Sequence, residues 1–443
     1  MEQKSRLGNI NPKYNTIKLK EILTRDNSGE WGDEPDKEFI YVIRGTNFNN
    51  DGILNITDIA LRYLTAEQIK EKKLYENDII IERSGGSDTQ PVGRVGFIDK
   101  KIADINCSCA NFIQRISLID SVNSKYIYYC LQQLYEMKQT TAMQAQTTGL
   151  RNLDWKMYKK TILPNPELKE QNVIAGIISK VDQCIENTQK TIDATQKLKK
   201  SLMQNLLTGR MKPDGTMRKD NEFYEHPKLG KVPISWEVKK LKDITLNRGD
   251  YGSNSSAVPF SKETPRFIRI TDISDDGQLF ENDAVSSTDT SEKYLLDEDD
   301  FLFARTGDTV GKSLLYKEKM GKAIFAGYLI RFVLNKELII PEYFDLIAKS
   351  EFFESFKVSM KRVGVKPNIN SREYCSFKFI MPTSKNEQLS ILKYFNSIFS
   401  KKIELNEKIL YLKRLKKSLM QNLLTGKKRV DVEKINNLLE SMK

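Results

Sequence analysis

The twelve residues LKKSLMQNLLTG occur twice in this chain, at residues 198–209 and again at 415–426. A repeat of this length constrains the fold more than any single motif, because both copies have to adopt the same local structure. At the same shift of 217 residues the similarity continues upstream, where Ile174 matches Ile391 and Val181 matches Ile398. The chain of 443 residues is therefore interpreted as two copies of one unit.

The part of each copy that precedes the repeat reads as short strands separated by turns. Apolar runs end in Asp-Gly turns or in loops rich in Gly, Ser and Thr, a pattern typical of β-structure. Three pairs of segments match in order: 39–52 with 266–277, 76–86 with 298–308, and 147–154 with 362–370. Each copy is predicted to hold a β-rich block of about 160 residues followed by one long helix, which makes the fold α+β.

A seven-residue apolar repeat marks the two helices. It runs through Ile174, Val181, Thr188, Thr195 and Leu202 in the first copy, and through Ile391, Ile398, Leu405, Leu412 and Leu419 in the second. This spacing is typical of a coiled coil. A helix of about 40 residues is about 60 Å long, more than its own block can cover. We expect the helices to pair antiparallel as a spacer with pseudo-two-fold symmetry, the second bringing the chain back to the first block.

Start and stop signals bound these helices. Asn165-Pro166 and Ser384 with Glu387 are N-terminal signals, and Gly209 and Gly426 follow the C-terminal ends. The expected segments are a β-rich block at 1–163, a helix at 164–209, a charged linker at 210–230, a second block at 231–382, a helix at 383–426 and a basic tail at 427–443.

Composition narrows the class of protein. The 71 Lys and Arg residues outnumber 59 Asp and Glu, giving a net charge of +12 that favours a polyanionic partner. The chain contains neither eighteen consecutive apolar residues nor an apolar N-terminal segment, so we expect a cytoplasmic protein without a membrane partner. Five cysteines without a CxxC pair and a single histidine, His226, argue against a metal site and against histidine-based catalysis.

The segment TGDTVGKS, at residues 306–313, resembles an enzyme motif more than any other part of the sequence does. It has three residues between its glycines where the phosphate-binding GxxxxGK[ST] loop requires four, and no helix signal follows. Neither GxGxxG nor HExxH occurs. We therefore predict no catalytic residues, no metal and no cofactor in this chain.

Side chains in matching loops of the two blocks are candidates for reading DNA. Arg, Asn, Ser and Thr at loop tips can contact base edges, while Lys fixes the phosphate backbone. In the first block the candidates are Arg44, Arg83, Ser84, Arg94, Thr148, Arg151 and Asn152. In the second block they are Arg269, Arg305, Thr306, Lys312, Arg362, Lys366, Asn368 and Arg372.

With this layout the chain resembles the specificity (S) subunits of type I restriction-modification systems. The resemblance covers nearly the whole chain and is carried by LKKSLMQNLLTG, by KLGKVPISWEVKKLKDI (228–244) and by DDFLFARTG (299–307). It implies two target recognition domains, each reading one half of a split double-stranded DNA sequence, with the helices setting the gap. The first block departs from the pattern, because YNTIKLKEI (14–22) lacks the Pro-Trp opening found at 233–236.

The resemblance also implies partner subunits. Two methyltransferase (M) subunits would dock on the helices and bring S-adenosylmethionine for adenine methylation, and restriction (R) subunits would add cleavage driven by ATP with Mg²⁺. Because the repeat is identical on its polar face as well, we expect docking at Lys199, Lys200, Gln204, Asn205, Lys416, Lys417, Gln421 and Asn422. The chain itself would serve host defence as a non-catalytic DNA-recognition subunit.

Two other classes stay open at this point. One is a nucleotide-hydrolysing enzyme that uses residues 306–313, which would require ATP turnover by the isolated chain. The other is a coiled-coil scaffold without a nucleic-acid role, which would fail to bind DNA even with its partner present.

Overall fold

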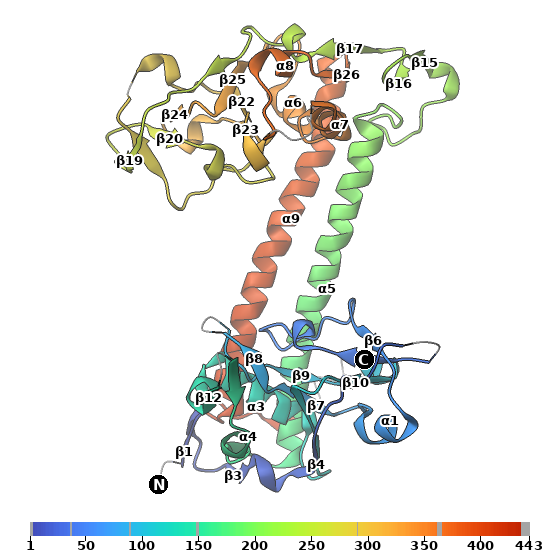
Figure 1. The fold of residues 1–443 in the computed structure, drawn as a ribbon, viewed down its shortest axis with the longest axis vertical. Helices are drawn as coiled ribbons and strands as arrows, with labels where there is room; N and C mark the ends of the chain where they lie inside the picture. The colour runs from blue at the N-terminus through green and yellow to red at the C-terminus, as the bar shows by residue number, and fades with distance from the viewer. Residues whose placement is uncertain are drawn as a thin grey trace. The chain divides into compact units, whose positions relative to one another are not determined.

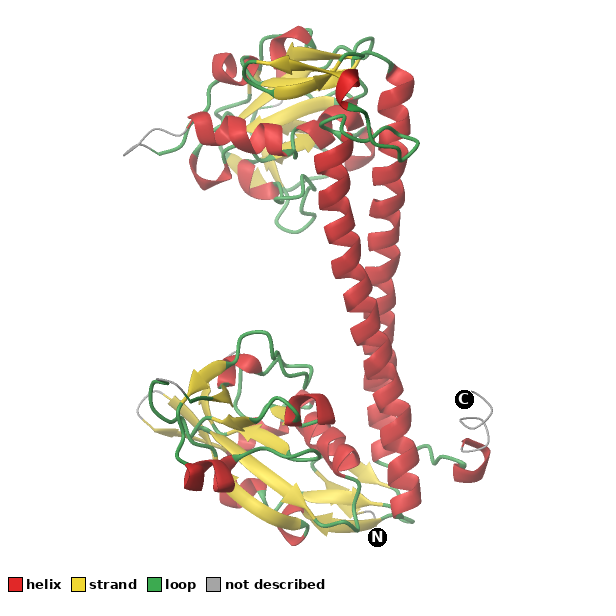
Figure 2. Ribbon diagram, turned by 90° about the vertical axis from the view of Figure 1, so that its right-hand side faces the viewer, coloured by secondary structure: helices red, strands yellow, loops and turns green. Residues whose placement is uncertain are grey.

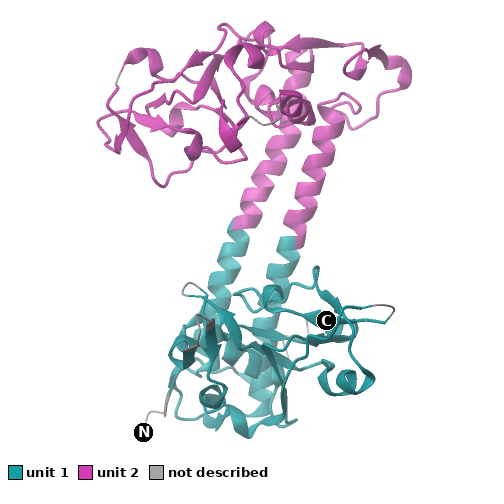
Figure 3. Ribbon diagram, viewed as in Figure 1, with its two compact units in different colours: residues 1–189, 407–443 teal, residues 190–406 magenta. Residues whose placement is uncertain are grey.

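The computed structural model describes residues 3–35, 38–87, 90–147, 150–289, 291–360 and 366–435. The chain divides into two compact units, shown in different colours in Figure 3. Unit 1 holds residues 1–189 together with 407–443, and unit 2 holds residues 190–406. The predicted segments differ from this division, because each unit combines one β-rich block with parts of both long helices.

The described part of unit 1 contains three sheets of three or four strands. Figures 1 and 2 show these strands as arrows. The antiparallel sheet has the order β4 (Leu23–Ser28), β11 (Ile113–Leu118), β7 (Ile79–Glu82) and β9 (Val95–Phe97). A mixed sheet has the order β10 (Cys107–Cys109), β5 (Ile40–Ile43) and β6 (Ala60–Arg62), with β10 parallel to β5. The third has the order β12 (Gln144–Thr147), β13 (Leu150–Leu153) and β8 (Ser84–Gly86).

Two strand pairs and four short helices complete the block of unit 1. The pairs are β1 (Gln3–Ser5) with β2 (Gly8–Ile10), and β3 (Asn15–Lys18) with β14 (Ile162–Asn165). The helices are α1 (Ala66–Lys72), α2 (Lys100–Ala103), α3 (Ser124–Glu136) and α4 (Trp155–Tyr158). Strand β7 is buried on both faces: Ile79 and Ile81 share a core with α3, while Ile80 packs with Cys107 and Cys109.

Unit 2 repeats the antiparallel sheet, the mixed sheet and the two strand pairs of unit 1. Its antiparallel sheet has the order β18 (Asp250–Tyr251), β25 (Leu329–Val333), β22 (Asp300–Ala304) and β23 (Ser313–Leu315). Its mixed sheet has the order β19 (Ala257–Pro259), β21 (Val285–Ser287), β20 (Arg266–Ile268) and β24 (Ala323–Phe325), with β24 parallel to β20. Two further pairs are β15 (Phe223–His226) with β16 (Gly230–Pro233), and β17 (Trp236–Lys240) with β26 (Lys378–Pro382). The short helices are α6 (Pro341–Ile347), α7 (Glu351–Met360) and α8 (Ser371–Cys375).

A buried ion pair occupies the same place in both antiparallel sheets. In unit 1, Arg115 on β11 contacts Asp78 beside β7, with 2.7 Å between Nε and Oδ2. In unit 2, Arg331 on β25 faces Asp300 on β22 at 3.5 Å. The duplication in the sequence is therefore a duplication of the fold, with strands β7 and β11 equivalent to β22 and β25.

The two long helices are α5 (Leu168–Leu206) and α9 (Lys385–Leu419), and α9 continues as one π-helical turn, η10 (Met420–Leu424). In unit 1, Val181 and Ile185 of α5 pack with Leu412, while the earlier α5 residues Ile174 and Ile178 share a core with η10. The residue numbers therefore run in opposite directions, which is antiparallel packing. In unit 2, Leu206 shares a core with the N-terminal part of α9, again antiparallel.

The end of each long helix packs against the block that precedes the other helix. Leu206 and Leu207 belong to the core of unit 2, and Leu423 and Leu424 to the core of unit 1. The return of the second helix to the first block is thus confirmed. Among the described residues, no helix combines the length and the apolar character that crossing a membrane would require.

The missing Pro-Trp opening of the first block has a structural substitute. Trp236 donates through Nε1 to Glu387 (3.1 Å), and the guanidinium of Arg218 lies over its ring. In unit 1, Tyr14 donates through its hydroxyl to Glu170 (2.9 Å), the residue that matches Glu387 in the repeat, and Arg429 lies over the Tyr14 ring. Tyr14 therefore takes the place of Trp236.

Candidate nucleic-acid interface

The loops that follow β7 and β22 have the same surroundings in the two units. Ser84 is paired with Asn152 across β8 and β13, and Thr306 is paired with Asn368 in an isolated bridge. The Arg83 carbonyl accepts from the N–H of Leu153 (2.8 Å), and the Arg305 carbonyl accepts from the N–H of Ile369 (2.9 Å). Each unit thus brings an arginine, a hydroxyl residue and an asparagine to one edge, and we call each trio a reading edge.

The arginine of each reading edge is held in place without being neutralised. Arg83 donates through Nη1 to Oε1 of Gln114 (2.8 Å), and its guanidinium carbon is 5.9 Å from the Trp155 ring centre. The Arg305 guanidinium carbon lies 4.8 Å from the centre of the Tyr251 ring. Both side chains are half-buried, and neither forms an ion pair with a carboxylate of the described residues. A positioned, uncompensated guanidinium can donate two parallel hydrogen bonds to a base edge.

The remaining candidates, from the loop around β13 in unit 1 and from the matching segment 362–370 in unit 2, are only partly described. Thr148 and Arg362 lie outside the described residues. Arg151 lies on β13, half-buried and opposite Gly86. Lys366 is exposed just before Asn368.

The sequence prediction for Arg94 is wrong, because its side chain points into unit 1. The guanidinium pairs with the buried carboxylate of Glu82, with Nη2 2.5 Å from Oε1 and Nε 2.8 Å from Oε2. It also donates to the carbonyls of Phe48 (2.7 Å) and Gly45 (2.9 Å). Because all three nitrogens of the guanidinium are engaged internally, Arg94 holds the loop of Arg44 in place and does not face DNA.

Arg44, Arg269 and Lys312 are each engaged by a neighbouring carboxylate. Arg44 contacts Asp58 (3.0 Å), and its counterpart Arg269 contacts Asp272 (2.8 Å). Lys312 lies 2.8 Å from Asp275. These three cations would have to exchange a protein partner for DNA, so they are weaker candidates than Arg83 and Arg305.

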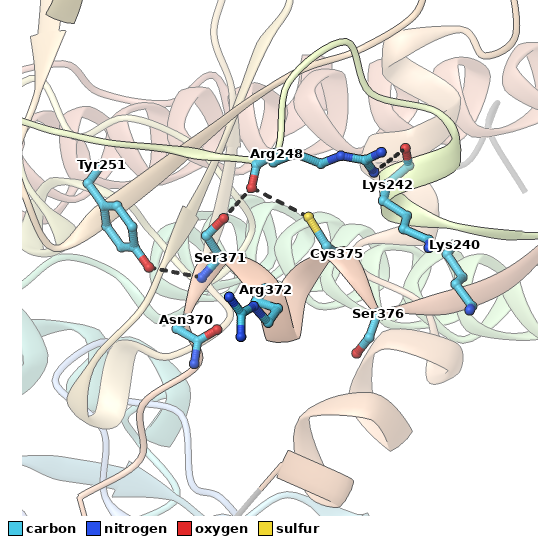
Figure 4. Close-up of a pocket in the computed structure, with 9 residues that line it drawn as sticks. All are labelled: Lys240, Lys242, Arg248, Tyr251, Asn370, Ser371, Arg372, Cys375 and Ser376. Carbon is cyan, nitrogen blue, oxygen red and sulfur yellow. Dashed lines mark hydrogen bonds between the residues drawn. The ribbon is translucent and has the colours of Figure 1, made fainter.

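A basic cavity of about 760 Å³ lies next to the reading edge of unit 2, because Tyr251 belongs to its lining and packs against Arg305. Figure 4 shows the residues that line it. Its cations are Lys240, Lys242, Arg248 and Arg372. Tyr251, whose ring lies under the Arg305 guanidinium, is one of the lining residues. Its hydroxyl accepts a hydrogen bond from the Ser371 N–H (3.1 Å). No carboxylate lines this cavity within the described residues. The cluster therefore continues the positive surface of the reading edge.

Only Arg372 of this cluster was found from the sequence. Lys240, Lys242 and Arg248 were missed, although the run KKLK at 239–242 is visible in the sequence. They become neighbours of Arg372 because α8 packs beside the end of β17: Cys375 on α8 donates through Sγ to the Arg248 carbonyl (3.4 Å).

The equivalent place in unit 1 is partly neutralised. Asp26 on β4 contacts Lys159 (2.6 Å) and accepts from Nε1 of Trp155 (2.9 Å). Lys20 is exposed at the position that matches Lys242. The two units therefore share the reading edge but differ in the charge beside it.

The structure does not support the phosphate-loop alternative for residues 306–313. A short 3-10 turn, η8 (Gly307–Thr309), leads into strand β23 and not into an α-helix. The lysine that would reach a phosphate, Lys312, is engaged by Asp275 and the Ile273 carbonyl. The helix N-terminus on which such a loop depends is missing here.

The polar residues of the duplicated helix end are not all available for docking. The prediction for Lys416 is wrong, because its side chain is buried in unit 1. Its amine lies 2.7 Å from the Asp182 carboxylate, and Asp51 and Tyr129 also lie against it. Lys199, its counterpart, is half-buried, and burial lowers its pKa. Lys200, Lys417 and Gln421 are exposed.

The amides of the same segment are used locally. Gln204 donates to Glu351 (2.6 Å). Asn205 and Asn422 donate to the carbonyls one turn earlier, Ser201 (2.9 Å) and Ser418 (2.7 Å). Both asparagines thus repeat one contact at the two helix ends, which is a structural reason for their identity.

Duplicated blocks, paired helices and matched arginine edges define a binding protein with two equivalent sites. The family model described as "Type I restriction modification DNA specificity domain" matches residues 11–196 and 233–414. The chain belongs to this family, and it contains two DNA specificity domains. This membership confirms the expectation of a DNA-recognition subunit and not an enzyme.

Curated relatives and solved structures agree with the family. The chain is 25% identical over 404 residues to the type I restriction enzyme MjaVIII specificity subunit of Methanocaldococcus jannaschii, covering 89% of this chain and 87% of that protein. It is 22% identical to the MjaIX specificity subunit of the same organism, covering 89% and 84%. The fold is similar to that of the type I S subunit from M. genitalium, with a TM-score of 0.55, 14% identity and coverage of 95% and 99%.

Proposed function

We propose that this chain selects the DNA target of a type I restriction-modification complex, with each unit reading one half of a bipartite sequence. The observation that carries this proposal is the duplicated reading edge, Arg83, Ser84 and Asn152 in unit 1 and Arg305, Thr306 and Asn368 in unit 2. Arginine pairs well with guanine and asparagine with adenine in the major groove.

Differences between the units support two different half-sites. The reading edges contain the same residue types, but their surroundings differ: Trp155 lies under Arg83, whereas Tyr251 lies under Arg305. The basic cavity beside Arg305 would bind phosphates and so fix the position of the second half-site without reading it.

The long helices support a role in setting the gap between half-sites. A helix of 39 residues, such as α5, rises about 58 Å along its axis. The antiparallel packing of the two helices within each unit supports this role. Inserting four residues, about one helical turn, into both helices should change the gap and leave the half-sites unchanged. An unchanged gap would contradict this role.

Partner subunits would supply the chemistry. Two M subunits would dock at the exposed positions of the repeat, Lys200 in the first copy and Lys417 and Gln421 in the second, and bring S-adenosylmethionine. R subunits would bring the site for ATP and Mg²⁺. A structure with a TM-score of 0.54, 12% identity and coverage of 94% and 99% concerns the assembly and conformational transition of a type I system, which supports such partners.

The direct test is to coexpress the chain with its M subunit and to map methylated adenines in the host genome. We expect one motif consisting of two short parts separated by a gap of constant length. A single continuous motif, or no methylation that depends on this chain, would overturn the proposal.

A further inference from the structure

One exposed aromatic residue occupies the same turn in each unit. Phe112 precedes β11, and Tyr328 precedes β25. Their exposed fractions are 66% and 61%, while the next residues, Ile113 and Leu329, are buried. Each exposed ring thus stands directly before a buried strand residue.

The turn of each aromatic residue is hydrogen-bonded to a reading edge. The Arg83 N–H donates to the Phe112 carbonyl (2.8 Å), and the Arg305 N–H donates to the Tyr328 carbonyl (3.0 Å). In unit 1, Phe112 also lines a cavity of about 820 Å³ together with Arg44 and Ser84. Each ring thus stands next to the arginine that we assign to base reading.

The fold does not account for these rings. Within the described residues, neither ring stacks on another aromatic side chain, and the Tyr328 hydroxyl has no hydrogen-bond partner. An exposed aromatic ring remains in contact with water, so it contributes little to folding. The same exposed chemistry at equivalent positions, with phenylalanine in one unit and tyrosine in the other, points to a shared external contact.

We propose that Phe112 and Tyr328 stack on DNA bases at the edge of each half-site and locally unstack the duplex. This inference rests on the proposed function. It adds a second type of DNA contact, in which an aromatic ring stacks on the face of a base. Every base has such a face, so stacking adds affinity without choosing a sequence. An apolar ring entering a base step also distorts the duplex, which a neighbouring arginine would stabilise by holding the adjacent base edge.

The cationic surroundings favour DNA over a protein partner. Next to each ring lies an arginine without a carboxylate partner among the described residues, Arg83 in unit 1 and Arg305 in unit 2, and such a guanidinium attracts phosphates. The apolar area of a single ring is also too small for a stable protein interface, which needs an apolar patch of many residues.

The test uses the complex of this chain with its M subunit and duplexes that carry 2-aminopurine, whose fluorescence rises on unstacking, at each position of the mapped target. The variants are Phe112→Ala and Tyr328→Ala, with Tyr328→Phe as the conservative variant. Leu246→Ala serves as the control, because Leu246 is 69% exposed and its N–H donates to the carbonyl of Val333, at the opposite end of β25 from Tyr328.

We expect each alanine variant to raise Kd for the target about tenfold and to abolish the 2-aminopurine signal in its own half-site only. Tyr328→Phe and Leu246→Ala should behave like the unmodified chain. Unchanged Kd and fluorescence in both alanine variants would overturn the proposal. Loss of M-subunit binding with normal DNA affinity would also overturn it, by assigning the rings to a protein contact. The methylation motif of the unmodified complex separates failure of this inference from failure of the proposed function.

Discussion

The guanidinium of Arg429 is hydrogen-bonded to the buried carboxylate of Glu170, with 2.6 Å between Nη2 and Oε2. In unit 2, Arg218 makes the matching contact with Glu387 at 2.5 Å. The same glutamate of the repeat is thus held in both units, each time by an arginine that follows the end of the other long helix.

Replacing Arg218 by alanine should destabilise unit 2 more than Arg429→Ala destabilises unit 1. The Arg218 side chain is 6% exposed and also donates to the Gly209 carbonyl (2.7 Å), so its loss leaves both Glu387 and this carbonyl without their partner. The Arg429 side chain is 46% exposed, so water can take its place beside Glu170. Removing one member of a buried pair costs about 3 kcal/mol. Urea unfolding measures the loss of stability in each variant, and amide hydrogen exchange assigns that loss to unit 1 or to unit 2. Lys231→Ala, which breaks the exposed pair with Asp220, should cause no measurable change.

The stability of unit 2 should depend on the protonation of Asp300. Burial raises the pKa of Asp300 to about 6, against the opposing effects of the Asp297 N–H and of Arg331. Between about pH 4 and pH 6 the folded protein keeps a proton that the unfolded chain has lost, so the free energy of unfolding falls as the pH rises through this window. The unmodified chain should therefore lose stability relative to Asp300→Asn from pH 4 to pH 6. If urea unfolding showed the same pH dependence of stability for both proteins across this range, the raised pKa of Asp300 would be contradicted.

Substituting the arginine of one reading edge should relax recognition of one half-site. Arg305→Ala should lower discrimination at one base of the half-site read by unit 2 by roughly 1–3 kcal/mol, and Arg83→Ala should do the same for unit 1. Competition binding with duplexes altered at single positions measures this effect. Arg269→Ala is the matched control, because its guanidinium is engaged by Asp272. Equal losses on all sequences would mean that the arginines bind phosphates only.

The basic cavity should contribute to affinity without contributing to specificity. Replacing both Lys242 and Arg248 by alanine should reduce the slope of log K against log salt by about 0.9 for each phosphate that the protein no longer neutralises, equally on target and altered duplexes. Lys239→Ala is the control, since Lys239 is paired with Glu237 (2.5 Å) and lies outside the cavity lining. An unchanged slope in the double variant would show that the cavity does not bind DNA.

The glycines that end the repeat should resist substitution. Gly209 has φ +68°, and a Cβ there would lie 2.3 Å from Cγ of Pro233. Gly215 has φ +87° but open space around it. Gly215→Ala should cost about 1–2 kcal/mol from the left-handed backbone alone, and Gly209→Ala clearly more. Thermal unfolding of both variants gives the difference, and equal costs would show that Pro233 yields without strain.

Local patterns were sufficient to predict much of this fold. The strand run at Ile79–Glu82, its partner at Asp300–Ala304 and the glycines after both helices all depend on neighbours in sequence. The positions of Arg83 and Arg305 followed from the same pattern, because a charged residue directly after a buried strand lies where the chain leaves the core.

Contacts between distant segments account for what the sequence could not predict. Arg94 and Lys416 have the composition of surface residues, and only the folded chain brings Glu82 and Asp182 to them. The basic cavity depends on α8 packing beside Arg248, more than a hundred residues earlier in the chain. Tyr14 could not be matched to Trp236 by residue type, because its role lies in the glutamate that it contacts.

The division of the chain between the units has a consequence for its synthesis. Unit 2 is one continuous stretch, residues 190–406, whereas unit 1 needs residues 407–435 to place Met420, Leu423 and Leu424 in its core. A ribosome that adds about 5–20 residues per second therefore spends tens of seconds on unit 2 while the first-made block waits for its last helix. Unit 1, which is translated first, is therefore completed last. A chain cut short by a late stop codon would hold a complete unit 2 and a unit 1 that lacks its last helix.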